Sequence, residues 1–162
     1  MTALVVSANP LHFAQMAELL NDIIAAGGTT AISEAVTKDE IQKWTERNSP
    51  SSAWHVAEND QGNVLGFQWI EPADYLPNDA AEIATFTKTG YTGMGIGTAL
   101  FEATCQAARR LGYRWINANI RSDNAGGLAY YQSRGFETYH TKKNVTLASG
   151  LVVDKTLKRF EV

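Results

Sequence analysis

Three alternating glycines, Gly93, Gly95 and Gly97, lie in the segment GYTGMGIGTAL, between a predicted strand and the most regular helical pattern of the chain. A glycine-rich loop at a helix start leaves backbone N–H groups free, and the helix dipole adds positive potential there. Such a loop is suited to bind an anion, most naturally a phosphate or pyrophosphate. The alternative is a glycine-rich turn that holds no ligand.

Two common phosphate motifs fail to describe this loop. A P-loop starting at Gly90 requires lysine where Ile96 stands. A dinucleotide fingerprint starting at Gly95 requires a third glycine where Leu100 stands, and no acidic residue follows about 20 positions later. The loop therefore belongs to another class of phosphate site, if it binds one.

A second block, NAGGLAYYQSRGF from Asn124 to Phe136, follows the glycine loop after one predicted helix and one strand. The two blocks, in this order, resemble the acyl-CoA-binding motif and the N-A-x-x-x-x-x-Y-x-x-x-G-F segment of the GNAT superfamily of N-acetyltransferases. The element order from about Leu4 to Phe160 is similar to that family's as well. Within it, the chain looks most similar to the amino-acid and small-amine acyltransferases related to phosphinothricin acetyltransferase.

The resemblance implies acetyl-CoA as co-substrate. No metal is expected, because His12, His55 and His140 are far apart in the sequence and lack ligand spacing. The resemblance also implies that strand backbone pairs with the pantetheine arm, that the glycine loop holds the pyrophosphate, and that an amide side chain contacts the cofactor. The implied cofactor-binding residues are Phe86, Thr87, Thr92, Gly93, Met94, Gly95, Ile96, Gly97, Thr98, Asn124 and Ser133. The family usually has Arg or Gln where this chain has Thr92, so one long side chain is missing while the N–H donors remain.

Acetyl transfer to an amine requires a base for the ammonium and benefits from an acid for the departing thiolate. The resemblance assigns the acid to Tyr131, whose phenol has an ordinary pKa of about 10 and stays protonated at neutral pH. Glu82 is the candidate base, with Glu71 and His55 as rivals. Glu71 and Tyr75 are also the expected substrate-binding residues. The alternative for Tyr131 is a core aromatic, and for Glu82 a solvent-facing strand residue.

Hydrophobic spacing predicts the elements that position these residues. Helical periodicity covers Phe13–Ile24, Lys38–Arg47 and Ile96–Leu111, and a short helix starts near Asn124 and ends at Gly135. Alternation or β-branched content predicts the strands, which are Leu4–Val6, the hairpin Ala53–Trp69, Glu82–Thr89, Trp115–Arg121, Phe136–Val145 and Leu151–Phe160. The fold class is mixed α/β (α+β), a GNAT-like sheet of about six or seven mostly antiparallel strands with about four helices.

The composition narrows the function classes. A chain of 162 residues fits one domain, 1–162. The chain has a single cysteine, Cys105, which excludes an intramolecular disulfide and suits a cytoplasmic setting. Helical spacing predicts that Cys105 lies on the polar side of the helix Ile96–Leu111. A net charge of −3 gives no support for nucleic-acid binding, and no apolar run is long enough to span a membrane. Exposed strand edges allow a homodimer.

The sequence thus predicts an N-acetyltransferase that moves an acetyl group from acetyl-CoA to a primary amine of a small molecule, an amino acid or a similar amine, by direct transfer in a ternary complex. Two alternatives stay open: a protein or peptide N-terminal acetyltransferase, and a CoA-binding module without catalysis, which the threonine at position 92 suggests.

Overall fold

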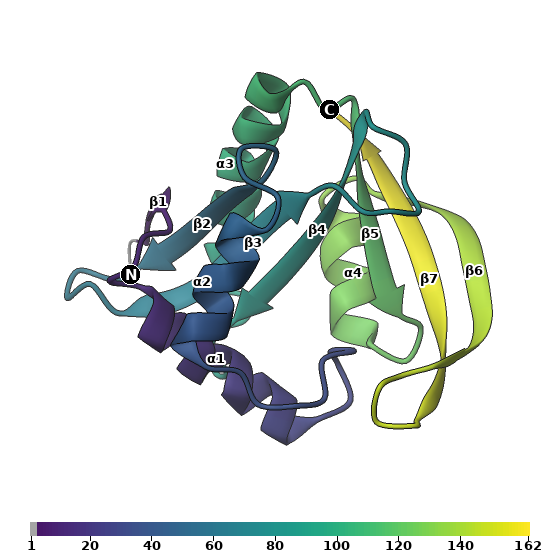
Figure 1. The fold of residues 1–162 in the computed structure, drawn as a ribbon, viewed down its shortest axis with the longest axis horizontal. Coiled ribbons are helices and arrows are strands. Elements are labelled where there is room, and N and C mark those ends of the chain that lie inside the picture. Colours follow the sequence, from purple (N-terminus) through teal and green to yellow (C-terminus); the bar gives the residue numbers. More distant parts are fainter. Residues whose placement is uncertain (1–2) are drawn as a thin grey trace.

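A computed structural model describes residues 3–162 as a seven-stranded sheet with helices on both faces (Figure 1). The strands are β1 (Leu4–Ser7), β2 (Ala53–Glu58), β3 (Val64–Glu71), β4 (Ala80–Thr87), β5 (Trp115–Arg121), β6 (Glu137–Thr146) and β7 (Val152–Glu161). The helices are α1 (Phe13–Ala26), α2 (Lys38–Glu46), α3 (Ile96–Leu111) and α4 (Ala125–Ser133). This order confirms the predicted mixed fold.

The sheet is interrupted at its centre, between β4 and β5. Its strand order is β1-β2-β3-β4-β5-β7-β6, and β4–β5 is the parallel pair among antiparallel ones. The β4–β5 register ends at Ile83 opposite Ala118, although β4 continues to Thr87 and β5 to Arg121. The two strands therefore separate over their second halves, and each presents an unpaired backbone edge to the gap.

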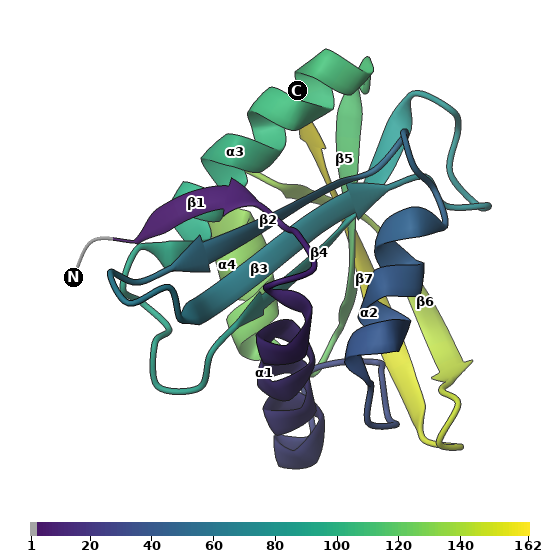
Figure 2. The same cartoon turned by 60° about the vertical axis from the view of Figure 1, so that its left-hand side comes forward.

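The two faces of the sheet carry separate hydrophobic cores. Figure 1 and Figure 2 show α1 and α2 on one face and α3 and α4 on the other. Helices α1 and α2 cover an aromatic layer that contains Trp54, Phe67 and Trp69, with the Trp54 and Trp69 rings stacked at 4.1 Å between centroids. Helices α3 and α4 cover the opposite face, where Ile116, Ala118 and Ile120 of β5 are buried. Because side chains alternate along a strand, the neighbours of these β5 residues face α1 and α2.

The ends of two helices follow from local signals in the sequence, a threonine before α2 and a glycine after α3. Thr37 caps α2, with its side chain accepting from the Glu40 N–H and the Glu40 carboxylate accepting from the Thr37 N–H. This capping box satisfies two otherwise free donors. Gly112 ends α3 in the left-handed conformation, at φ 85°. No helix in residues 3–162 is both long and apolar enough to cross a membrane.

Cys105 contradicts its sequence-based placement, because it is buried in the core on the α4 side of the sheet. That placement follows from a single apolar stripe in the sequence of α3, formed by Ile96, Leu100, Ala103, Ala107 and Leu111, from which Cys105 points away. The helix instead buries two sides: Ile96 and Leu100 pack with Leu65, while Phe101 and Cys105 pack in the second cluster. A thiol within such a core is a small apolar group.

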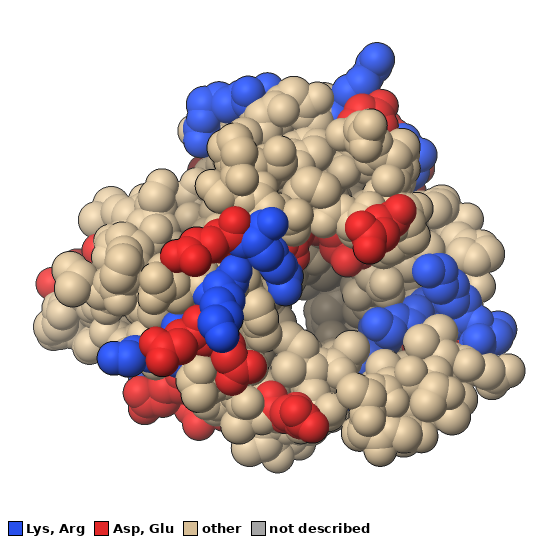
Figure 3. All heavy atoms as spheres, in the orientation of Figure 1, with Lys and Arg blue, Asp and Glu red and all other residues tan. Residues whose placement is uncertain are grey.

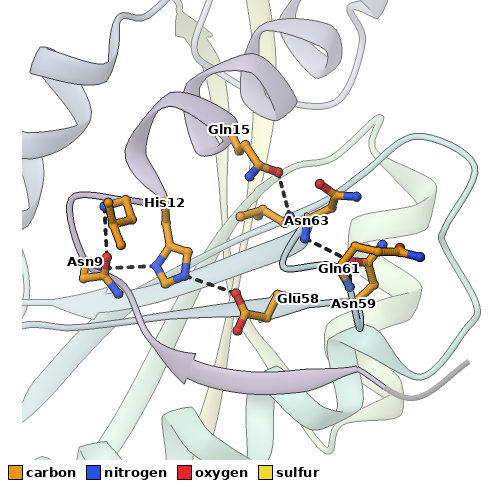
Figure 4. A network of polar contacts seen from close by, with 9 residues as sticks. Asn9, His12, Gln15, Glu58, Asn59, Gln61 and Asn63 are labelled. Atoms are coloured by element: carbon orange, nitrogen blue, oxygen red, sulfur yellow. Dashed lines mark hydrogen bonds and ion pairs between the residues drawn. The ribbon is translucent and has the colours of Figure 1, made fainter.

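A polar network fixes the start of α1 against the β2–β3 turn (Figure 4). The Asn9 N–H donates to Nδ1 of His12, so Nε2 carries the proton and donates to the Glu58 carboxylate at 3.3 Å. Gln15 of α1 accepts from the Val64 N–H at the start of β3. These contacts hold the first turn of α1 to the end of β2 and the start of β3.

Candidate active site

The separation of β4 and β5 opens into a cavity of about 1070 Å³. Its walls are the second halves of both strands, the loop before α3, the first turns of α3 and α4, and the segment between α1 and α2. Figure 3 shows a hollow on the face that carries α1 and α2, with Lys and Arg side chains gathered on its β6–β7 side. The cavity brings together the glycine loop and the second block, Asn124–Phe136.

The glycine loop turns through left-handed backbone at Gly90, Gly93 and Gly95, with φ of 88°, 79° and 79°. Side chains at these positions would be strained, which explains the glycines. The first helical hydrogen bond in the turn runs from the Ala99 N–H to the Gly95 carbonyl. The N–H groups of residues 96–98 therefore lack a helical acceptor, which is the arrangement that binds phosphate.

Gly97, which was predicted to contact the cofactor and lines the cavity, also has a packing role. Its backbone is helical, and a Cβ built there would lie 2.5 Å from Cε1 of Tyr130. The Tyr130 hydroxyl donates to the Gly97 carbonyl at 2.7 Å and accepts from the Gln68 amide at 3.1 Å. The missing side chain at Gly97 thus makes room for α4 to pack against the start of α3.

The free edge of β4 offers a second binding feature. Ala84–Thr87 pair with β3 on one side, and within the described chain no strand pairs with them on the other. Backbone polar groups on that side need partners. An extended ligand with amide groups, lying in the gap, would complete the sheet there. Phe86 and Thr87, predicted to contact such a ligand, line the cavity.

Glu82 projects from β4 into the cavity on the α1–α2 face. Its Oε1 accepts from the Tyr75 hydroxyl and from Nδ2 of Asn117 at 3.2 Å. Burial raises the pKa of Glu82 above its ordinary value, although these two hydrogen bonds and Lys155 oppose the rise. A carboxyl whose pKa lies closer to neutrality, and whose position is fixed by two donors, suits proton transfer.

Tyr131 lies on the other face, at the floor of the cavity, where its hydroxyl shares a 2.8 Å hydrogen bond with Thr85. It is also a buried member of the α4-side core. Burial raises the pKa of Tyr131 well above its ordinary value, so its phenol stays protonated. Its packing and its position in the cavity are compatible, because the ring is buried while the hydroxyl faces the gap.

The two rivals of Glu82 sit in other environments. Glu71 lines the cavity, but its carboxylate accepts from Arg47, Asn48 and Trp69. Burial alone would raise the pKa of Glu71, yet these hydrogen bonds hold it below its ordinary value, so the carboxylate is a weak base. His55 lies on β2 and does not line the cavity, and burial followed by the nearby Arg110 charge lowers its pKa.

Of the predicted site residues, Tyr75, Met94, Gly95 and Thr98 do not line the cavity. The Tyr75 hydroxyl nevertheless contacts Glu82, and Thr98 accepts from the Arg134 guanidinium. Both Asn124 and Ser133 line the cavity, and both already make protein contacts. Asn124 caps α4 and donates to the Thr29 carbonyl at 3.2 Å, while Ser133 donates to a carbonyl of its own helix.

The sequence analysis did not single out several polar residues on this side of the cavity: Arg47, Asn119, Arg121 and Lys155 line it, and Asn117 donates to Glu82 beside it. Asn117, Asn119 and Arg121 alternate along β5, and Lys155 lies on β7 opposite Arg121. The asparagines have a sequence signal, because two amides at alternate positions in WINANIR mark one polar face in an otherwise apolar strand. Lys155 has none, because it lies in a mixed polar strand. Within residues 3–162, no three His, Cys, Asp or Glu side chains cluster as a metal site would require.

Comparison with known proteins agrees with this geometry. The family model described as "Acetyltransferase (GNAT) family" matches residues 15–136. A protein of Bacillus subtilis (strain 168) named "Putative phosphinothricin acetyltransferase" is 29% identical over 120 residues, which are 73% of this chain and 74% of that protein.

Two solved structures share the fold. A GNAT superfamily phosphinothricin acetyltransferase from Sinorhizobium meliloti, in complex with AcCoA, superposes with a TM-score of 0.86 at 19% identity, covering 100% of this chain and 89% of that one. A ribosomal-protein-alanine N-acetyltransferase from Brucella melitensis gives 0.88 at 23% identity, covering 98% and 99%. At these identities the likeness establishes the fold and leaves the acceptor open.

Proposed function

The chain belongs to the GNAT acetyltransferase family, and from that premise we propose that it transfers an acetyl group from acetyl-CoA to the primary amine of a small molecule. The transfer is direct, in a ternary complex, and is carried out by a single domain spanning residues 1–162. The supporting observation is the cavity between β4 and β5, which runs from the glycine loop to Glu82 and Tyr131.

The cavity residues fit acetyl-CoA as a substrate. The free N–H groups at the start of α3 suit the pyrophosphate, and the unpaired edge of Ala84–Thr87 suits the amides of the pantetheine arm. Thr92 lines the cavity without a long side chain, so backbone donors carry the phosphate contacts. A thioester held in the gap would lie between the two faces of the sheet, within reach of both candidate catalytic groups.

In the proposed reaction, the acceptor amine first loses a proton to the Glu82 carboxylate, because only the neutral amine is nucleophilic. The amine nitrogen then attacks the thioester carbonyl carbon, so the C–N bond forms and the C–S bond breaks. Tyr131 gives its proton to the departing thiolate, the surplus proton on the attacking nitrogen passes to the Tyr131 oxygen and restores the phenol, and Glu82 releases its proton to water. Burial raises the pKa of both groups, which favours their protonated forms. The raised pKa makes Glu82 a stronger base. It makes Tyr131 a weaker acid, which donates its proton only as negative charge develops on the thiolate sulfur.

The segment between α1 and α2 supports a small acceptor. It lines the cavity and is held to β5 and α4 by two hydrogen bonds, from Arg121 to the Thr30 carbonyl and from Asn124 to the Thr29 carbonyl, each of 3.2 Å. This clamp restricts the opening from that side. A free amine enters such a site more readily than a folded protein's N-terminus. We also place the activity in the cytoplasm, since the lone cysteine is buried and unpaired in residues 3–162.

Thiol release from acetyl-CoA, followed against a panel of amino acids, polyamines, aminoglycosides and short peptides, tests this function. We expect release that depends on a small amine, with the acetylated amine identified by mass. Initial rates with both substrates varied should give intersecting lines, as a ternary complex requires. Parallel lines would indicate a covalent intermediate, and activity restricted to peptides would indicate an N-terminal acetyltransferase.

A further inference from the structure

Most charges around the acceptor side of the cavity are already paired. The Arg47 guanidinium is bound to the Glu71 carboxylate, and the Arg121 guanidinium is bound to Asp123 through hydrogen bonds of 3.0 and 2.8 Å. Each pair is close to neutral. Glu82 and Lys155 are the remaining charged groups among the cavity-lining residues.

Lys155 is a half-buried cation that lines the cavity, and no residue in 3–162 accepts a hydrogen bond from its Nζ or forms an ion pair with it. The cross-strand neighbours of Lys155 are also cationic and do not neutralise its charge. Across the sheet Lys155 lies opposite Arg121 of β5 and Lys142 of β6, so three cations share one row and one face. Arg121 is paired with Asp123, and the Lys142 ammonium lies 4.4 Å from the centre of the Tyr75 ring.

Lys155 and Glu82 face the same side of the sheet. Glu82 is opposite Asn117 in the β4–β5 register and accepts a hydrogen bond from it. Asn117 and Arg121 are four residues apart on β5, so they share a face, and Lys155 shares it through its pairing with Arg121. The proposed acid, Tyr131, lies on the opposite face. A molecule that brings its amine to Glu82 therefore lies along the surface that ends at Lys155.

Resting on the proposed function, we propose that the acceptor is an amine that also carries a carboxylate, and that Lys155 is the specificity-determining residue that binds this anionic group. An amino acid matches the two unpaired charges, with its ammonium toward Glu82 and its carboxylate toward Lys155. Burial lowers the pKa of Lys155 because its ammonium group loses contact with water, and the Glu82 charge opposes that shift. A carboxylate bound to Lys155 would stabilise the ammonium in place of the lost water. A polyamine or an aminoglycoside would instead place a second cation against Lys155 and its neighbour Lys142.

The same lysine has a second possible ligand, a phosphate of acetyl-CoA, because the cavity also contains the glycine loop. The two roles predict different kinetic effects. A carboxylate-binding lysine affects the acceptor terms and discriminates an amino acid from its carboxamide. A phosphate-binding lysine affects the KM for acetyl-CoA equally with every acceptor.

The test compares the amino acid that reacts fastest in the panel with its carboxamide, in the wild type and in K155M, at saturating acetyl-CoA. Because both variants see the same two acceptors, the different basicity of their amines cancels. K155R keeps the charge. K143M makes the same chemical change at an exposed lysine that pairs with Asp154, away from the cavity. Thermal unfolding of each variant checks the fold.

We expect K155M to lower kcat/KM for the amino acid about ten- to hundredfold, the range for losing a charged hydrogen bond. The carboxamide, the KM for acetyl-CoA, and all parameters of K143M should not change, and K155R should keep most of the activity. Equal losses for both acceptors, or a raised KM for acetyl-CoA, would overturn the inference while the acetyltransferase function stands. Failure of every amine to react in the wild type would contradict the proposed function itself.

Discussion

Gly97→Ala tests whether the third glycine of the loop serves packing between α3 and α4. The added Cβ would lie 2.5 Å from Cε1 and 3.2 Å from Cζ of Tyr130, whereas ordinary contacts begin at 3.4 Å. The ring would have to move by 3.4 − 2.5 = 0.9 Å. That movement breaks or stretches the two hydrogen bonds of the Tyr130 hydroxyl, to the Gly97 carbonyl and from Gln68.

The expected cost follows from these contacts. Two net hydrogen bonds contribute about 1 kcal/mol each, and overpacking adds about 1–3 kcal/mol. The higher helix propensity of alanine offsets somewhat less than about 1 kcal/mol of this lost unfolding free energy. The net loss of unfolding free energy is then about 2–4 kcal/mol, or a fall in Tm of about 5–15 °C for a chain of this length.

Urea unfolding of four proteins measures the effect: the wild type, Gly97→Ala, Tyr130→Leu and the double variant. Because Tyr130→Leu removes the ring that the new Cβ meets, the double variant should be more stable than the sum of the single changes by about 1–3 kcal/mol. Gly126→Ala is the matched control, since the nearest atom to its Cβ is 3.9 Å away. Additive losses in the double variant would refute the packing role.

Two further changes test the site. Tyr131→Phe keeps the ring in the core and removes the proton donor, so kcat should fall about 10²–10⁴-fold with the CoA dissociation constant unchanged, as measured by steady-state kinetics and calorimetry; an unaltered kcat would remove Tyr131 from the mechanism. Glu71→Gln should destabilise the protein at pH 7 by about 1–3 kcal/mol, because Arg47 loses its carboxylate. Folding lowers the pKa of Glu71, so the ionised carboxylate stabilises the protein above pH 4.5, the ordinary pKa, and this stabilisation is lost as the pH falls below that value. The melting temperatures of wild type and variant should therefore converge in acid. A difference that stays constant with pH would contradict this assignment.

Local signals predicted most of the fold. The capping residue Thr37, the terminating Gly112 and the regular pattern of α3 act within one helix, so the sequence contains them completely. Strand ends are less local. The expected strand Glu82–Thr89 is β4, Ala80–Thr87, because pairing with β3 ends at Thr87 and Gly90 then turns with positive φ.

Long-range packing explains what the pattern could not predict. Cys105 is buried because α3 contacts the sheet and α4's side of the core together, and a single helix contains no information on that second neighbour. The role of Gly97 likewise depends on Tyr130, 33 residues away. The glycines at 93 and 95, by contrast, act through their own backbone conformation, which a glycine pattern does predict.

The candidate site divides in the same way. The glycine loop and Tyr131 could be predicted because each lies in a block that is continuous in sequence, and residues of both blocks line the cavity. The charge environment of the acceptor side comes from separate elements. Arg47 follows α2, Glu71 ends β3 and Lys155 lies on β7. Which carboxylate stays unpaired with a cation, Glu82 or Glu71, is decided only when these elements meet.

The rate of acceptor-dependent thiol release in Glu82→Gln tests the central claim most directly. Glutamine keeps an oxygen that accepts from Tyr75 and Asn117, so the fold and the CoA dissociation constant should be unchanged. Loss of the base should lower kcat about 10²–10⁴-fold with the best amine of the panel. A variant that acetylates this amine at the wild-type rate would contradict the account.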